Sequence, residues 1–182
     1  YKSWILYLCD DAGSAETKKL CEQYAAADPD RVRYIRNETN WANVTRGRNT
    51  ALLLGECKYY VFMDDDNTMK PARLSEQVMF LLDHNEAGMV WCQSEGFRDG
   101  QPCGVLRPNA PKIYDREQLE KDNYIDSNEI MVKAQVFEQI GLFDERMNAL
   151  EDWDFVLRVG NRFTAYHQPK PLIYYGLHGA NR

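Results

Sequence analysis

Three consecutive aspartates, Asp64, Asp65 and Asp66, directly follow the apolar run 59–63. This run, Tyr-Tyr-Val-Phe-Met, is short, aromatic and β-branched, which is typical of a buried strand. Binding groups of a parallel sheet lie at the carboxyl ends of its strands. Adjacent carboxylates repel one another unless a cation holds them, and Mg²⁺ or Mn²⁺ suits carboxylates and phosphates together. The triplet therefore predicts a metal presented to a phosphorylated ligand; the alternative is a solvated acidic turn before the helix that Pro71 opens.

Strand and helix patterns alternate along the chain. Strands are predicted at 4–9, 32–35, 59–63, 89–92, 129–132 and 163–166, and helices after Ser14 and at 44–54, 71–83, 134–140 and 151–159. Residues 97–106 resemble a hairpin, whereas 108–123 and the tail from 174 to 182 show no clear element. This alternation predicts an α/β domain with a mostly parallel central sheet flanked by helices, plus a small antiparallel hairpin. Asp10 and Asp11 also follow a strand, so we expect them at the same sheet edge as the triplet.

The helix at 71–83 has an apolar stripe at helical spacing. Leu74, Val78, Leu81 and Leu82 are expected on its buried side.

Composition excludes several classes of protein. The net charge of −6, with 28 acidic and 22 basic residues, argues against nucleic-acid binding through a basic face. No apolar run approaches the ~20 residues of a transmembrane helix. The five cysteines contain no C-x-x-C spacing, which argues against structural zinc and favours a reducing compartment. We expect a cytoplasmic protein; peripheral membrane contact is compatible with the sequence, although no basic amphipathic helix indicates it.

Two polar segments each admit two interpretations. Glu151 and Asp152 stand at a helix start, where carboxylates offset the helix dipole, but a carboxylate beside Trp153 is also a candidate general base. Arg46 and Arg48 lie near another helix start, where they either form a solvated face or bind a diphosphate.

His178 lies in a glycine-flanked tail. It is a candidate metal or phosphate ligand, and a frayed carboxyl end is the alternative.

The order of these segments resembles the family 2 glycosyltransferases, which have the GT-A fold. The similarity covers nearly the whole chain and is carried by WILYLCDDAGSAET at 4–17, GRN at 47–49, FMDDDN at 62–67, GLFDE at 141–145, EDWD at 151–154 followed by Leu157 and Arg158, and HGANR at 178–182. Each motif is weak alone, but their shared order is specific.

The resemblance implies roles for individual residues. It assigns Asp152 as catalytic base with Glu151 in support, and it implies Mn²⁺ or Mg²⁺ as cofactor. The nucleotide-sugar would contact Asp10, Asp11, Arg48, Asn49, Asp64 and Asp65; the metal would contact Asp64, Asp66 and His178; and Asn128, Glu129 and Trp153 are candidates on the acceptor side.

Residues 1–182 are expected to form one GT-A-like domain, with a nucleotide-binding half at 1–95 and an acceptor-binding half at 96–182. Family members normally carry a strand and helix ahead of the position of Tyr1, so the sequence is expected to be a fragment or a naturally shortened version. The resemblance then predicts the loss of a central strand and of part of the base pocket. A second copy of the chain, as in a homo-oligomer, is one source of the missing strand.

The expected function is inverting, metal-dependent transfer of a hexosyl group from a UDP-sugar to a saccharide or lipid-linked acceptor, as in polysaccharide biosynthesis. A single base opposite the leaving group gives one displacement and inverts the anomeric centre. A non-catalytic remnant that binds nucleotide or glycan is the main alternative. A nucleotidyltransferase is disfavoured because the chain lacks a glycine-rich basic loop near its start.

Overall fold

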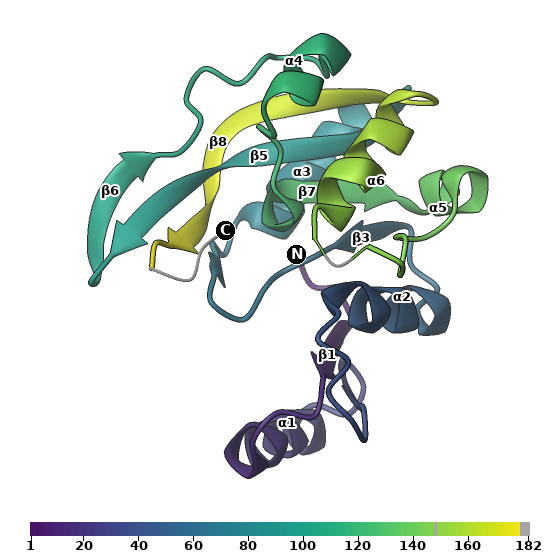
Figure 1. Ribbon diagram of the computed structural model, residues 1–182, viewed down its shortest axis with the longest axis vertical. Helices are drawn as coiled ribbons and strands as arrows, with labels where there is room; N and C mark the ends of the chain where they lie inside the picture. Colours follow the sequence, from purple (N-terminus) through teal and green to yellow (C-terminus); the bar gives the residue numbers. More distant parts are fainter. Residues whose placement is uncertain (148, 179–182) are drawn as a thin grey trace. The chain divides into compact units, whose positions relative to one another are not determined.

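The computed structural model describes residues 1–147 and 149–178 (Figure 1). The chain forms two compact units, Tyr1–Glu56 with Leu142–Glu151, and Cys57–Gly141 with Asp152–Arg182. Each unit has its own sheet: two strands in the first and six in the second. Among the described residues, no helix has both the length and the apolar character needed to cross a membrane.

The first unit is built on one parallel strand pair. β1 (Leu6–Asp10) pairs with β2 (Val32–Arg36), and α1 (Ala15–Ala27) connects them. The hydroxyl of Ser14 caps α1 by accepting the Thr17 N–H at 3.1 Å, as the sequence predicts. α2 (Val44–Leu54) follows and contacts β1. The predicted strand at 4–9 is only partly buried: Leu6 is 44% exposed, and β1 lies in a two-stranded sheet.

The second unit contains a mixed sheet. Its strand order is β3-β7-β5-β8-β4, with β6 paired to β5. The strands are β3 (Tyr59–Val61), β4 (Thr68–Met69), β5 (Ala87–Arg98), β6 (Gln101–Val105), β7 (Ile130–Lys133) and β8 (Thr164–Gly176). β5 and β8 run side by side in parallel (Figure 1), and the other pairs in this sheet are antiparallel.

Helices lie against this sheet. α3 (Arg73–Asp83) packs on β5 and β8, and Figure 1 shows α6 (Glu151–Gly160) on the other side of the sheet. The short helices are α4 (Arg116–Lys121), the 3₁₀ turn η1 (Ser127–Glu129) and α5 (Ala134–Ile140). One core cluster joins α3 to β5 and β7 and contains Val78, Leu81, Ala87, Val90 and Met131.

The expected α/β fold is confirmed, with corrections to its details. The second sheet is mixed, not mostly parallel, because alternating helices and strands do not fix strand direction. The hairpin is confirmed: Asp99 and Gly100 both have positive φ, 51° and 75°, as a two-residue hairpin turn requires. α4 lies in the stretch predicted as irregular, and β8 extends to Gly176 in the predicted tail. The tail residues 179–182 lie outside the described residues.

The compact units do not coincide with the predicted halves. The division falls after Glu56 and around Leu142–Glu151, whereas β5 runs across the predicted boundary at 95. Because those halves were defined by function, they stay a prediction.

The two neighbouring leucines near the end of α3 provide a test of the core. Leu81 is 0% exposed, whereas Leu82, also predicted to be buried, is 50% exposed. Leu81→Ala should lower the free energy of unfolding by about 2–5 kcal/mol, because it leaves a cavity. Leu82→Ala is the matched control and should change it by less than about 1 kcal/mol. Urea unfolding measures both, and equal losses would contradict this packing.

Candidate active site

In the second unit, the structure brings Asp66 and His178 together. The Asp66 Oδ2 and His178 Nε2 atoms are 2.9 Å apart, and both side chains are partly exposed. Asn67 joins the two segments that carry them: its Nδ2 donates to Asp66 Oδ1 at 2.8 Å and its Oδ1 accepts the Gly176 N–H at 3.0 Å. A Cβ at Gly176 would lie 2.7 Å from the main-chain oxygen of Asp66. Asp64, Asp65 and Asp66 form the acidic loop, and this close approach of β8 to it therefore requires glycine.

Asp64 is held in a different way. Its main-chain N–H donates to Asn128 Oδ1 at 2.7 Å, and its Oδ2 accepts from Asn128 Nδ2 at 2.9 Å. Asp126 holds the same amide, since its Oδ1 accepts from Asn128 Nδ2 at 2.8 Å. The main-chain pairing of β3 with β7 ends at Val61 and Met131. Beyond that point, the Asn128 side chain provides the hydrogen bonds that connect the two segments. Asp65 is exposed.

The predicted metal set is only partly assembled. Within the described residues, no group of three or more His, Cys, Asp or Glu side chains is arranged to hold a metal ion. Asp66 and His178 still form a carboxylate–imidazole pair whose ligand chemistry is compatible with Mn²⁺, whereas Mg²⁺ prefers oxygen ligands such as the Asp66 carboxylate. Such ions are commonly bound through one or two carboxylates plus substrate phosphates and water, and imidazole is acceptable to transition metals.

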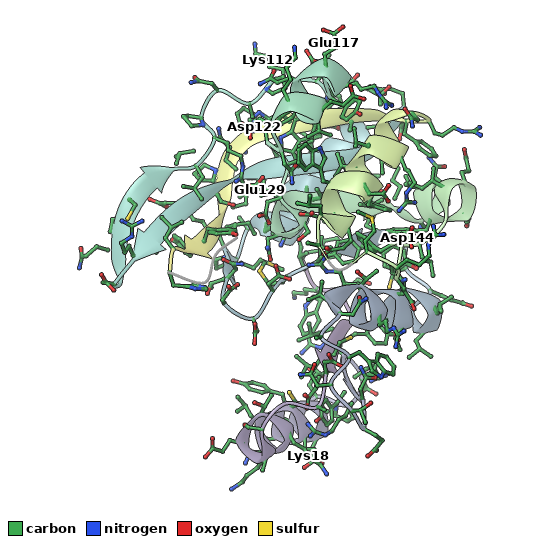
Figure 2. All side chains as sticks on the ribbon, in the orientation of Figure 1. Lys18, Lys112, Glu117, Asp122, Glu129 and Asp144 are labelled. Carbon is green, nitrogen blue, oxygen red and sulfur yellow. The ribbon has the colours of Figure 1, made fainter. Side chains whose placement is uncertain are left out.

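Glu129 lies in the interior of the second unit (Figure 2), with 2% of its surface exposed. Its carboxylate accepts from Ser94 Oγ at 2.7 Å and from Arg107 Nη2 at 2.9 Å. Burial raises the pKa of Glu129 above its ordinary value, and the positive charge of Arg107 opposes this shift. Asn128 is also 2% exposed. This burial favours a positioning role for Asn128 and Glu129 over the predicted direct contact with an acceptor.

The sequence analysis missed a buried polar pair on α3. Arg73, 0% exposed, donates to the main-chain oxygens of Phe62, at 3.4 Å, and Ile130, at 3.0 Å, while Gln77 Nε2 donates to the main-chain oxygen of Glu129 at 2.8 Å. Burial lowers the pKa of Arg73 to about 10, so it stays charged at neutral pH. The sequence held one signal for this pair: Arg73 and Gln77 are spaced i, i+4, and Leu81, on the buried side of the helix, follows four residues later.

Asp152 and Trp153 lie at the start of α6. The Trp153 N–H donates to Asp152 Oδ1 at 2.8 Å, so this carboxylate is bonded within the first turn of the helix. The indole Nε1 of Trp153 is buried without a hydrogen-bond partner among the described residues. A donor of this kind remains able to bind a ligand oxygen.

In the first unit, Asp10 and Asp11 each organise a loop. Burial alone would raise the pKa of Asp10, but hydrogen bonds from Tyr34 and from the Gly13 N–H, together with Arg36, hold it below its ordinary value. Asp11 accepts from Asn37 Nδ2 at 3.0 Å, and both of its carboxylate oxygens contact the Trp41 N–H, at 3.1 and 3.0 Å; together these bonds lower its pKa against the effect of burial.

α2 carries the other two predicted nucleotide ligands. Arg48 Nη1 is 2.9 Å from Glu151 Oε1, and both side chains are largely buried. Asn49 is 3% exposed and bonded to the main chain of Phe143. The structure therefore places Arg48 beside the predicted supporting acid, and it places Asn49 in the interior of the first unit. The nucleotide roles of Asp10, Asp11 and Arg48 stay predictions.

Comparison with known proteins decides the family. The model described as "Glycosyl transferase family 2" matches residues 1–140, and "Glycosyltransferase like family 2" matches 113–181. The chain belongs to glycosyl transferase family 2. The resemblance found in the sequence is confirmed.

Individual relatives agree with this assignment. "Putative glycosyltransferase EpsE" of Bacillus subtilis is 30% identical over 165 residues, 87% of this chain and 56% of that protein. "Putative colanic acid biosynthesis glycosyl transferase WcaA" of Escherichia coli is 30% identical over 168 residues, with the same coverage of 87% and 56%. The chain thus spans about half the length of the curated relatives it matches.

A solved structure shows the same fold. The crystal structure of residues 1–349 of Staphylococcus aureus TarS, in complex with UDP-GlcNAc, superposes with a TM-score of 0.77 at 18% identity. The match covers 97% of this chain and 50% of the TarS chain. The similarity confirms the expected GT-A-type fold.

Gly176→Ala tests the approach of β8 to the acidic loop. The added Cβ would collide with the main chain of Asp66, so we expect the Asp66–His178 contact to be lost. The imidazole nitrogen resonances of His178, read by NMR, should move. Gly47→Ala is the control, because its Cβ would meet only Cys9 Cβ at an ordinary 3.4 Å. Unchanged His178 resonances in Gly176→Ala would contradict this geometry.

Proposed function

We propose that this chain carries the donor-binding and catalytic part of an inverting, metal-dependent glycosyltransferase. It transfers a hexosyl group from a UDP-sugar to a hydroxyl of a saccharide or lipid-linked acceptor. Membership of glycosyl transferase family 2 supports the reaction class. The TarS neighbour, whose crystal structure contains UDP-GlcNAc, supports a UDP-sugar as donor. The proposal depends on a single observation, the Asp66–His178 pair. These two metal-compatible side chains lie 2.9 Å apart, and Asp66 belongs to the acidic loop.

In the proposed reaction, the acceptor oxygen attacks the anomeric carbon of the sugar. The bond between that carbon and the diphosphate oxygen breaks, and UDP leaves with the electron pair. The carboxylate of Asp152 takes the proton of the attacking hydroxyl. One displacement of this kind inverts the anomeric configuration.

Asp66 and His178 would hold the metal ion. When bound, the metal supplies positive charge that stabilises the leaving diphosphate. Asn67 orients the Asp66 carboxylate through its 2.8 Å hydrogen bond, and ligands oriented in this way bind metals more tightly. The indole N–H of Trp153, buried and unpartnered among the described residues, is suited to an acceptor oxygen beside Asp152. A cytoplasmic location and a homo-oligomeric state stay predictions.

Asp152→Asn tests the proposed base. The amide keeps a side-chain oxygen that can accept the Trp153 N–H but cannot serve as the base, so transfer should fall by about 10²–10⁴-fold. UDP release from a panel of UDP-sugars with saccharide acceptors measures transfer, and calorimetry with UDP measures donor binding, which should be retained. Asp154→Asn is the matched control, because Asp154 pairs with Arg158 at 2.8 Å on the same helix.

Two outcomes would oppose the proposal. Equal rates of transfer by the wild type and by Asp152→Asn would show that Asp152 is not the general base. UDP binding without transfer by the wild type, for every donor and acceptor in the panel, would favour the non-catalytic nucleotide-binding alternative.

A further inference from the structure

The loop that precedes α6 contains a buried main-chain segment with no strand to pair with. Phe143 is 3% exposed and lies outside helices and strands. Its N–H donates to Asn49 Oδ1 at 3.1 Å, and its main-chain oxygen accepts from Asn49 Nδ2 at 3.0 Å. Buried main-chain groups need such partners. The Asn49 amide therefore pairs with the Phe143 peptide as a neighbouring strand would, across 94 residues of sequence.

Asn49 has no amide hydrogen left for a ligand. Its Nδ2 carries two hydrogens, and its two acceptors are the main-chain oxygen of Phe143 and Glu145 Oε1, each at 3.0 Å. The residue itself is 3% exposed. This arrangement argues against the contact with the nucleotide-sugar that the resemblance assigns to Asn49.

α2 and its N-cap residue, Asn43, hold this loop at further points. Asn43 Nδ2 donates to the main-chain oxygen of Glu145 at 3.0 Å. At the far end of the loop, Arg48 Nη1 lies 2.9 Å from Glu151 Oε1, with the two side chains 12% and 11% exposed. The Arg48 guanidinium also lies 5.7 Å from the ring centre of Phe143. α2 thus fixes the segment Leu142–Glu151 of the first unit near both of its ends.

We propose that Asn49 is a positioning residue that sets the main chain at Phe143, in the segment of the first unit that also carries Glu151. The inference rests on the proposed glycosyl transfer, because Glu151 is the supporting acid assigned to that reaction. It predicts that Asn49 governs turnover and not affinity for the nucleotide.

Asn49→Asp and Asn49→Ala test this assignment. Asn49→Asp keeps the side-chain shape but removes both donors and faces the Phe143 oxygen and Glu145 with a negative charge. Hydrogen exchange of the Phe143 amide, read by mass spectrometry on the peptides of 142–147, should accelerate at least about tenfold in both variants. Asn85→Ala, in an exposed turn of the second unit, is the matched control and should leave this exchange unchanged.

Kinetics and binding separate positioning from ligand contact. In both Asn49 variants, kcat should fall at least about tenfold, while KM for the UDP-sugar and the Kd of UDP stay within about threefold of wild type. A residue that only supports global stability would leave kcat of the folded protein unchanged. If the wild type itself does not bind UDP, the proposed function fails, and hydrogen exchange at 142–147 still decides whether Asn49 holds the loop.

Two results would overturn the inference. One is unchanged exchange at 142–147 in both variants, and the other is a loss of UDP affinity of about tenfold or more with kcat retained. Should both variants fail to fold, as judged by circular dichroism, Asn49→Ser takes their place. Its shorter side chain lacks the amide that bonds both main-chain groups of Phe143, so the same exchange and kinetic criteria then decide.

Discussion

The need of buried main-chain groups for hydrogen-bond partners shapes both units of this protein. Strand pairing meets that need within the sheets, but the loops that carry several of the candidate site residues lie beyond the ends of the strands. There, side-chain amides substitute for strands: Asn128 bonds the N–H and carboxylate of Asp64, and Asn49 bonds both main-chain groups of Phe143. Loops held in this way keep a defined position without belonging to a sheet.

In the acidic loop, one aspartate is held by hydrogen bonds and another is exposed to solvent. Asp64 is anchored by Asn128, and the preceding Phe62 is bonded through its main-chain oxygen to the buried Arg73. Asp66, in the same loop, and its partner His178 remain partly exposed, with side-chain exposures of 40% and 46%. A buried charge such as Arg73 is costly unless it is well hydrogen-bonded, and its bonds here go to main-chain oxygens and Gln77. Through its bond to the Phe62 oxygen, Arg73 helps to hold the start of the acidic loop that contains Asp66.

Local patterns in the sequence predicted much of this structure. The bounds of α2 and α5 match the helices predicted at 44–54 and 134–140, and the order of motifs indicated the family. Strand direction and the partners of individual side chains depend on tertiary contacts that no local pattern encodes. Asn49 was predicted to be a nucleotide ligand because it belongs to the GRN motif, and Asn128 was predicted to lie on the acceptor side. A sequence does not show that an amide faces a main chain 64 or 94 residues away.

The most direct test of the donor site is calorimetric titration of the chain with UDP in Mn²⁺, in Mg²⁺ and in EDTA, repeated for Asp66→Ala. Asp83→Ala, an exposed acid at the end of α3, is the matched control. The account predicts binding that requires the metal, is weakened at least about tenfold in Asp66→Ala and is unaffected in Asp83→Ala. Binding of equal affinity in EDTA, or in Asp66→Ala with Mn²⁺, would contradict it.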